Sequence, residues 1–198
     1  MTLLDAAILG LVEGITEYLP VSSTGHLILT SALLGLDGAG IDAFNIVIQG
    51  GAILAVLGLY RVRVLGMAQG LIGQNPEGRR LLTRLLIAFA PAAILGPLLD
   101  DTIEATLFQP VPVLAALAVG GFIMLKLGKG RANPSDTDPA DLPLRAALLI
   151  GLAQCVAMWP GTSRSMVTLA AGVALGLRPA RAAEFSFLLG LPTLGGAC

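Results

Sequence analysis

The sequence predicts an all-α, polytopic membrane protein with inverted-topology repeats and two re-entrant helical hairpins. Three observations predict it: a low content of charge, apolar stretches of membrane-spanning length, and a polar break that occurs twice. Of the 198 residues, 55% are hydrophobic and only 13% are charged, whereas a soluble domain carries about 25% charged residues. A very apolar α-bundle in water is the alternative, but it explains neither the low charge nor the segment lengths. We therefore expect membrane lipids around the chain.

Four apolar stretches are near the length needed to cross a bilayer core of about 30 Å. They are 43–60, 84–99, 111–127 and 182–198. The net charge is −1, and there is no basic stripe outside the loops, so nothing indicates a nucleic-acid partner. Two cysteines, Cys155 and Cys198, are too few for a disulfide framework or a cysteine metal site.

Charges between the apolar stretches predict the orientation. Eleven of the twelve Lys and Arg residues, all but Arg164, fall into three groups, which the positive-inside rule places on the cytoplasmic side. The intervening loops carry acidic residues, which we expect outside. The basic groups are Arg61, Arg63, Arg79, Arg80 and Arg84; Lys126, Lys129, Arg131 and Arg145; Arg178 and Arg181; the acids are Asp37, Asp42, Asp100, Asp101 and Glu104.

Segments 3–35 and 144–176 do not fit as simple spans. Each has a helical half, a break at Pro20 or at Pro160-Gly161, and a second helical half, and each begins and ends on the same side by its loop charges. We interpret them as re-entrant hairpins, the first entering from outside and the second from the cytoplasm. Non-helical backbone at membrane depth needs protein or a watery cavity around it, which two hairpins meeting near the midplane would provide.

An internal repeat supports this interpretation. The run Gly10–Glu13 matches Gly151–Gln154 at an offset of 141, and Phe44 matches Phe185 at the same offset. Opposite entry of the two hairpins makes the repeat inverted, which places a site at the repeat interface. The alternative is chance similarity between apolar helices.

The repeat also predicts domain limits within one transmembrane domain, 1–198. Repeat one covers about 1–130, and repeat two begins near 144 and is incomplete at 198. By the duplication we expect repeat two to continue to about residue 270, so that two or three helices would follow.

Three charged residues lie in apolar surroundings: Glu13, Glu17 and Arg164. A charge at membrane depth is expensive and marks a functional site with a partner. Glu13 and Glu17 are four residues apart, so on a helix their carboxylates share one face, and at least one should be protonated or bound to a cation. The alternatives are a solvated helix end with two acids, and a structural ion pair of Arg164 with either glutamate.

Hydroxyl groups follow the first break. Ser22 or Ser23 would cap the next helix, and free backbone N–H groups there, beside Thr24, form an anion site. His26 is the single histidine of the chain and lies one to two turns from the two carboxylates. We favour an acid–base or nucleophilic role for it over simple packing.

The second break has the same pattern of hydroxyl residues after a helix break. Thr162 and Ser163 follow Gly161, and Arg164 adds a guanidinium suited to bidentate phosphate contact. Two helix N-termini, an arginine, hydroxyls, a histidine and paired carboxylates together suit phosphoryl transfer. A transporter or flippase for a phosphorylated lipid or small anion is the runner-up, since inverted repeats with broken helices are a transporter architecture.

The run from Gly10 to His26 resembles the first signature of bacterial undecaprenyl-pyrophosphate phosphatases, the bacitracin-resistance type. The run from Trp159 to Ser165 resembles their second. The resemblance implies hydrolysis of undecaprenyl pyrophosphate to undecaprenyl phosphate for cell-wall carrier-lipid recycling. It also implies a divalent cation, Mg²⁺ or Ca²⁺, and a multi-pass protein of the bacterial inner membrane whose site is reached from the outer leaflet. A homodimer is left open.

Carried over by motif position, the resemblance implies roles for individual residues. Glu13 and Glu17 would bind the metal, with Glu17 also moving a proton. Ser23 and His26 would be the nucleophile and acid–base candidates, and which one attacks is left open. Arg164 would clamp the pyrophosphate, assisted by Thr24 and Ser163. We expect the neighbouring hydroxyl residues Ser22 and Thr162 to bind the substrate as well.

Two positions depart from the family's usual pattern. Met166 stands where glycine usually follows the second signature, and Gly50 replaces a more usual apolar residue. We expect Met166 to narrow the cavity near Arg164.

Overall fold

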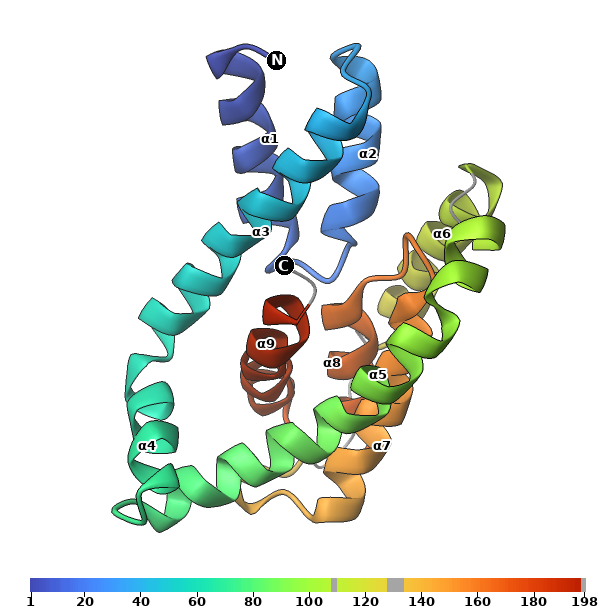
Figure 1. Cartoon of the computed structure of the whole chain (residues 1–198). Helices are drawn as coiled ribbons and strands as arrows, with labels where there is room; N and C mark the ends of the chain where they lie inside the picture. The colour runs from blue at the N-terminus through green and yellow to red at the C-terminus, as the bar shows by residue number, and fades with distance from the viewer. Residues whose placement is uncertain (108–109, 128–133, 197–198) are drawn as a thin grey trace.

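A computed structural model describes residues 1–107, 110–127 and 134–196 of the chain, and these residues form helices joined by short connections (Figure 1). Within them the one β-type pairing is an isolated bridge between Ser135 and Leu177. The prediction of an all-α protein is confirmed. The helices are α1 (Leu3–Thr16), α2 (Ser23–Leu33), α3 (Ala39–Leu59), α4 (Arg61–Leu71), α5 (Pro76–Leu107), α6 (Pro110–Leu127), α7 (Leu144–Gln154), α8 (Arg164–Ala174) and α9 (Pro179–Gly195), with 3₁₀ turns η1 (Pro139–Asp141) and η2 (Cys155–Met158).

Helices α8 and α9 occupy the middle of the molecule. They pack on each other, and α9 also contacts α3 on one side and α5 on the other (Figure 1). The paired helices α1 and α2 lie beyond them at one end, and the turn between α4 and α5 forms the opposite end. The tip of the α1–α2 pair therefore faces the start of α8.

The core lies where α5, α7 and α9 meet. Leu85, Ile150 and Phe185 from these three helices are almost fully buried. Gly151 allows the close packing of α7 on α5, because a Cβ at this position would overlap the carbonyl group of Ala88. Many large apolar side chains are exposed on the outer faces of the helices, as expected where lipid rather than water is the neighbour.

By length and composition, one helical stretch among the described residues, Pro76–Leu99, is able to cross a membrane. The pair Ala43–Leu59 and Arg61–Leu71 passes the same test jointly, but it bends by 83° at the break. Val111–Lys126 is apolar but shorter. Of the four predicted spans, 84–99 has full spanning length, as part of a longer helix. The predicted span 182–198 coincides with most of helix α9, which has 17 residues and is partly buried.

Both predicted breaks are present. The first separates α1 from α2, and the second separates η2 from α8. Ser22 caps α2 and Ser163 caps α8 through their side-chain oxygens, and the two caps keep the offset of 141 seen in the sequence. The hydroxyl runs therefore have the capping role that the sequence predicts, and they begin two helices at equivalent positions.

Each break is docked onto a neighbouring helix by an aromatic side chain. The Tyr18 hydroxyl donates a hydrogen bond to the Ala52 carbonyl of α3 at 3.0 Å, and the Trp159 ring N–H donates one to the Pro112 carbonyl of α6 at 3.1 Å. Gly161 has φ +89°, and a Cβ there would lie 2.6 Å from the Val113 carbonyl oxygen. Glycine is therefore required at this tip.

Arg63 forms the centre of an ion-pair network at the α4–α5 end, called here the Arg63 network. Its guanidinium pairs with Glu77 at 2.6 Å, with Glu184 at 2.8 Å and with Asp138. Arg181 joins the network through Asp138 and Glu184. Arg63 of the first basic group and Arg181 of the third therefore lie at the same end of the molecule, as expected if both groups lie on the same side of the membrane. Lys129 and Arg131 lie outside the described residues, as do the side chains of Asp42, Asp100, Asp101 and Glu104.

Candidate active site

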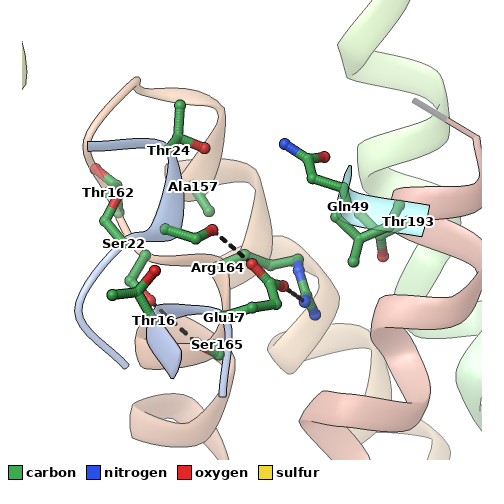
Figure 2. Close-up of a pocket in the computed structure, with 13 residues that line it drawn as sticks. Thr16, Glu17, Ser22, Thr24, Gln49, Ala157, Thr162, Arg164, Ser165 and Thr193 are labelled. Atoms are coloured by element: carbon green, nitrogen blue, oxygen red, sulfur yellow. Dashed lines mark hydrogen bonds and ion pairs between the residues drawn. The ribbon is translucent and has the colours of Figure 1, made fainter. Parts of the chain in front are cut away.

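A polar cavity of about 200 Å³ lies where the two breaks meet, and we call it the polar cavity (Figure 2). The N-termini of α2 and α8 both open onto it, because each contributes its capping serine and the residues that follow. Backbone N–H groups at two helix N-termini favour an anion. The lining residues are Thr16, Glu17, Ser22, Ser23, Thr24, Gln49, Ala157, Thr162, Ser163, Arg164, Ser165, Thr193 and Leu194.

Arg164 contacts Glu17 across the cavity. Its Nη2 donates to Glu17 Oε1 at 2.7 Å, and its Nη1 donates to the Ser186 carbonyl at 3.1 Å. The two side chains are 14% and 13% exposed, so the pair is shielded but not sealed. The structural pair that the sequence leaves as an alternative therefore exists, and Glu17 rather than Glu13 is the partner.

The guanidinium of Arg164 lies directly against the backbone of α9. A Cβ added to Gly190 would lie 2.9 Å from Arg164 Nη1 and 3.0 Å from Nη2. Thr168, one turn along α8, donates its hydroxyl hydrogen bond to the Arg164 carbonyl at 2.9 Å, and its Oγ1 lies 2.6 Å from Ser186 Oγ. These contacts hold the arginine in place without adding a second carboxylate.

Ser23 completes a three-membered chain with Glu17 and Arg164. The Ser23 hydroxyl donates to Glu17 Oε2 at 2.6 Å. The other oxygen of the same carboxylate accepts from Arg164 (Figure 2). A hydroxyl whose proton points at a carboxylate is the arrangement of an activated nucleophile and its base. The arginine holds that carboxylate in place and is also able to contact an anion in the cavity.

Glu13 is separated from this chain. It is 2% exposed and does not line the polar cavity. Both of its carboxylate oxygens are buried and have no hydrogen-bond partner among the residues that the structure describes. In the same residues, no group of three or more His, Cys, Asp or Glu side chains is placed to hold a metal ion. A metal would therefore meet few protein ligands, with Glu13 as the available carboxylate.

His26 also lies apart from the polar cavity. Its Nδ1 is 2.8 Å from the Ser22 carbonyl, and because a carbonyl can only accept, Nδ1 carries the hydrogen. In the neutral ring Nε2 is then left as an acceptor. The ring lines a neighbouring, mostly apolar cavity of about 350 Å³, which shares Ser163 with the polar cavity.

Sequence reasoning missed two polar side chains that come from distant helices. Gln49 of α3 and Thr193 of α9 line the polar cavity on the side of the Arg164–Glu17 pair opposite Thr24 and Thr162 in Figure 2. Gln49 interrupts an apolar stretch, and that isolation is a signal that could have found it. Thr193 has no comparable signal, because only the packing of α9 brings it to the cavity.

Met166 does not line the cavity that holds Arg164, so the prediction that it narrows that cavity is wrong. It is 2% exposed on the first turn of α8 and points between two apolar cavities beside α6. The reason is helical geometry: two residues along a helix turn a side chain to a different face.

The sequence profile of the family described as bacitracin resistance protein BacA matches residues 6–198. The chain belongs to this family. The BacA family thus covers both breaks and all of the residues that line the polar cavity.

Relatives of this BacA chain are named undecaprenyl-diphosphatase. One from Sorangium cellulosum is 48% identical over 98% of this chain and 64% of its own length, and one from Ectopseudomonas mendocina is 48% identical over 96% and 68%. A relative from Rhodospirillum rubrum, named undecaprenyl-diphosphatase 2, is 50% identical over 98% and 71%. The chain thus spans about two thirds of the length of these relatives.

Proposed function

We propose that the chain is a membrane phosphatase that hydrolyses undecaprenyl pyrophosphate to undecaprenyl phosphate and inorganic phosphate. The relatives' shared name supports the substrate. The observation that carries the proposal is the hydrogen-bonded chain of Ser23, Glu17 and Arg164 inside a cavity faced by two helix N-termini. It combines a nucleophile, a base and an anion-binding group at bonding distances.

The geometry favours Ser23 over His26 as the nucleophile. In the proposed reaction Ser23 Oγ attacks the terminal phosphorus and its proton passes to Glu17 Oε2. The bond from that phosphorus to the bridging oxygen breaks, and undecaprenyl phosphate leaves. Water then hydrolyses the phosphoserine, which frees phosphate and restores Ser23. His26 contacts the Ser22 carbonyl instead, so we assign it to the cap and to the neighbouring cavity.

Arg164 and the helix N-termini would stabilise the charge that develops on the transferred phosphoryl group. Arg164 faces the cavity with a planar guanidinium that suits two phosphate oxygens. Ser22, Thr24, Thr162 and Ser163 line the same cavity and would hold the remaining oxygens.

A divalent cation, Mg²⁺ or Ca²⁺, fits Glu13 better than it fits a carboxylate pair. The buried, unpartnered oxygens of Glu13 suit a hard cation, whereas both oxygens of Glu17 already accept hydrogen bonds. Mg²⁺ is commonly bound by one or two carboxylates together with substrate phosphates. Glu13 does not line the polar cavity, so an ion on its carboxylate, one helical turn from Glu17, would offset part of the pyrophosphate charge from beside the cavity.

We also propose that the chain is a multi-pass protein of the bacterial inner membrane, with its polar cavity reached from the outer leaflet. In this arrangement α1–α2 and α7–α8 are re-entrant hairpins of two inverted repeats, about 1–130 and 144–198. The paired breaks and their equivalent serine caps support it. A homodimer remains a prediction that chemical cross-linking in membranes would test.

The test is phosphate release from undecaprenyl pyrophosphate in liposomes, with and without EDTA, recorded together with transbilayer movement of the lipid. We expect release that EDTA removes and excess Mg²⁺ restores. Movement of the lipid without release would favour the transporter alternative. Ser23→Ala is the matched variant: it should abolish release and any phosphoserine, while His26→Ala should retain phosphoserine.

A further inference from the structure

Two apolar cavities adjoin the polar cavity at consecutive residues. The larger, about 350 Å³, shares Ser163 with it, and the smaller, about 180 Å³, shares Thr162. We call them the His26 cavity and the Trp159 cavity after a residue that lines each. Both run along α6, so a molecule whose polar end lies at Arg164 has an apolar exit in two directions.

The His26 cavity lies between α2, α6 and α8. Leu29, Leu117 and Met124 supply apolar walls, and its polar side chains are His26 and Ser163. Helix α2 closely approaches α6 here, because a Cβ on Gly25 would lie 3.1 Å from Leu117 Cδ2. Gly121 faces open space, with no atom within 4 Å of the position its Cβ would take.

Met166 and Gly120 separate the two apolar cavities. Both residues line both cavities, and a Cβ on Gly120 would lie 3.2 Å from Met166 Cε. The methionine side chain thus fills the space beside the glycine and divides one apolar groove into two. Methionine stands here where the family resemblance implies a glycine.

We propose that the His26 cavity receives the prenyl chain of a lipid diphosphate next to its headgroup, and that Met166 sets how far the chain extends toward the Trp159 cavity. The inference rests on the proposed function, which supplies the amphiphilic substrate. A prenyl chain joined to a diphosphate in the polar cavity must leave along an apolar surface. The His26 cavity is the larger exit, and it adjoins the capping serine of α8.

The experiment uses a geranylgeranyl diphosphate analogue with a diazirine on its first isoprene units. Photolysis with the full chain in membranes should label Leu117 or Met124, and unlabelled undecaprenyl pyrophosphate should compete. Gly121→Leu should fill the cavity and lower this labelling about tenfold, since the added side chain takes the place of the isoprene units against the apolar walls. Ala118→Leu is the matched control, because Ala118 is exposed on the same helix and lines neither cavity.

Met166→Gly should join the cavities and extend labelling to Val119 and Ile123, whereas the volume-conserving Met166→Leu should keep the original pattern. Labelling of outward lipid-facing residues that Gly121→Leu leaves unchanged would overturn the proposal. Hydrolysis of isopentenyl diphosphate, which has one isoprene unit, tests the headgroup chemistry separately. Cavity labelling without hydrolysis of any diphosphate would reject the phosphatase and leave the prenyl site standing.

Discussion

Arg63 and Arg164 are both shielded arginines, yet their surroundings differ in charge. Arg63 pairs with three carboxylates, Glu77, Asp138 and Glu184, whereas Arg164 pairs with Glu17 and a backbone carbonyl. Their side chains are 21% and 14% exposed, so burial does not separate them. The difference lies in balance: acids surround Arg63, while Arg164 faces a cavity in which an anion would be a second partner. The comparison indicates a structural role for Arg63 and a functional role for Arg164.

Replacing Arg164 should have the largest effect. Arg164→Ala should lower phosphate release from undecaprenyl pyrophosphate by about 10³-fold, because a charged donor to the developing phosphoryl charge is lost. Arg164→Lys should recover only part of the rate, since an ammonium group lacks the bidentate fork. The free energy of unfolding in detergent is the control and should fall no further than in Arg63→Ala, because Arg164 pairs with one carboxylate, and that carboxylate keeps its hydrogen bond from Ser23. Phosphate release at the original rate in Arg164→Ala would contradict a functional role for Arg164.

Replacing Arg63 should show the opposite pattern. Arg63→Ala removes the partner that three carboxylates share, and two of the three keep a contact to Arg181, so the free energy of unfolding should fall by about 1.5–3 kcal/mol. Phosphate release per folded molecule should stay near its original value. Arg80→Ala is the matched control, because the Arg80–Asp141 pair is exposed and should contribute less than about 1 kcal/mol. Equal losses in both variants would show that the Arg63 network is no more than a surface feature.

Glu13→Gln tests whether Glu13, whose carboxylate has no hydrogen-bond partner among the described residues, serves the site. We expect phosphate release to fall about 10- to 100-fold and the Mg²⁺ concentration for half-maximal release to rise. Stability should hold or improve, because the variant removes a buried carboxylate with no hydrogen-bond partner in the described residues. Asp5→Asn, at the exposed start of the same helix, should leave the Mg²⁺ dependence unchanged. An unaltered Mg²⁺ dependence in Glu13→Gln would assign the cation elsewhere.

The smallest effect concerns pH and the Arg63 network. Burial opposes ionisation of Asp138, but hydrogen bonds from Arg63 and the Ala140 N–H outweigh it and hold the pKa of the carboxyl below its ordinary value of 3.8. Its contribution to stability is therefore complete above that value and is lost as the pH falls below it. Unfolding midpoints measured from about pH 6 to pH 3 should fall less steeply in Asp138→Asn than in the original chain. Parallel curves would show that Asp138 is not the titrating group.

The sequence predicted features that depend on local chemistry. Proline and glycine located both breaks, and serines at the start of the following helices located both caps. An ion pair of Arg164 with either Glu13 or Glu17 was an alternative that the sequence left open. The choice of Glu17 depends on how α1 meets α8, which no local rule contains.

Features that depend on packing between distant helices were not predicted. Gln49 and Thr193 reach the cavity only because α3 and α9 contact each other. His26 was grouped with Ser23 by sequence distance, but its Nδ1 hydrogen bond to the Ser22 carbonyl turns the ring toward α6. Met166 was expected beside Arg164 because the two are close in sequence, but two residues along α8 place its side chain on a different face of the helix.

The close approach of Gly190 to Arg164 predicts the effect of substitutions at Gly190. It contributes no side chain to the site, but a methyl group there would meet the Arg164 guanidinium at 2.9 Å. The guanidinium is the far end of a flexible side chain, so it would swing aside at little cost to folding. Gly190→Ala should therefore give a normal amount of folded protein in which Arg164 no longer contacts Glu17. In a mutational survey, substitutions at Gly190 should lower activity as much as substitutions at Arg164. Selection would act on Gly190 only through its effect on the position of Arg164.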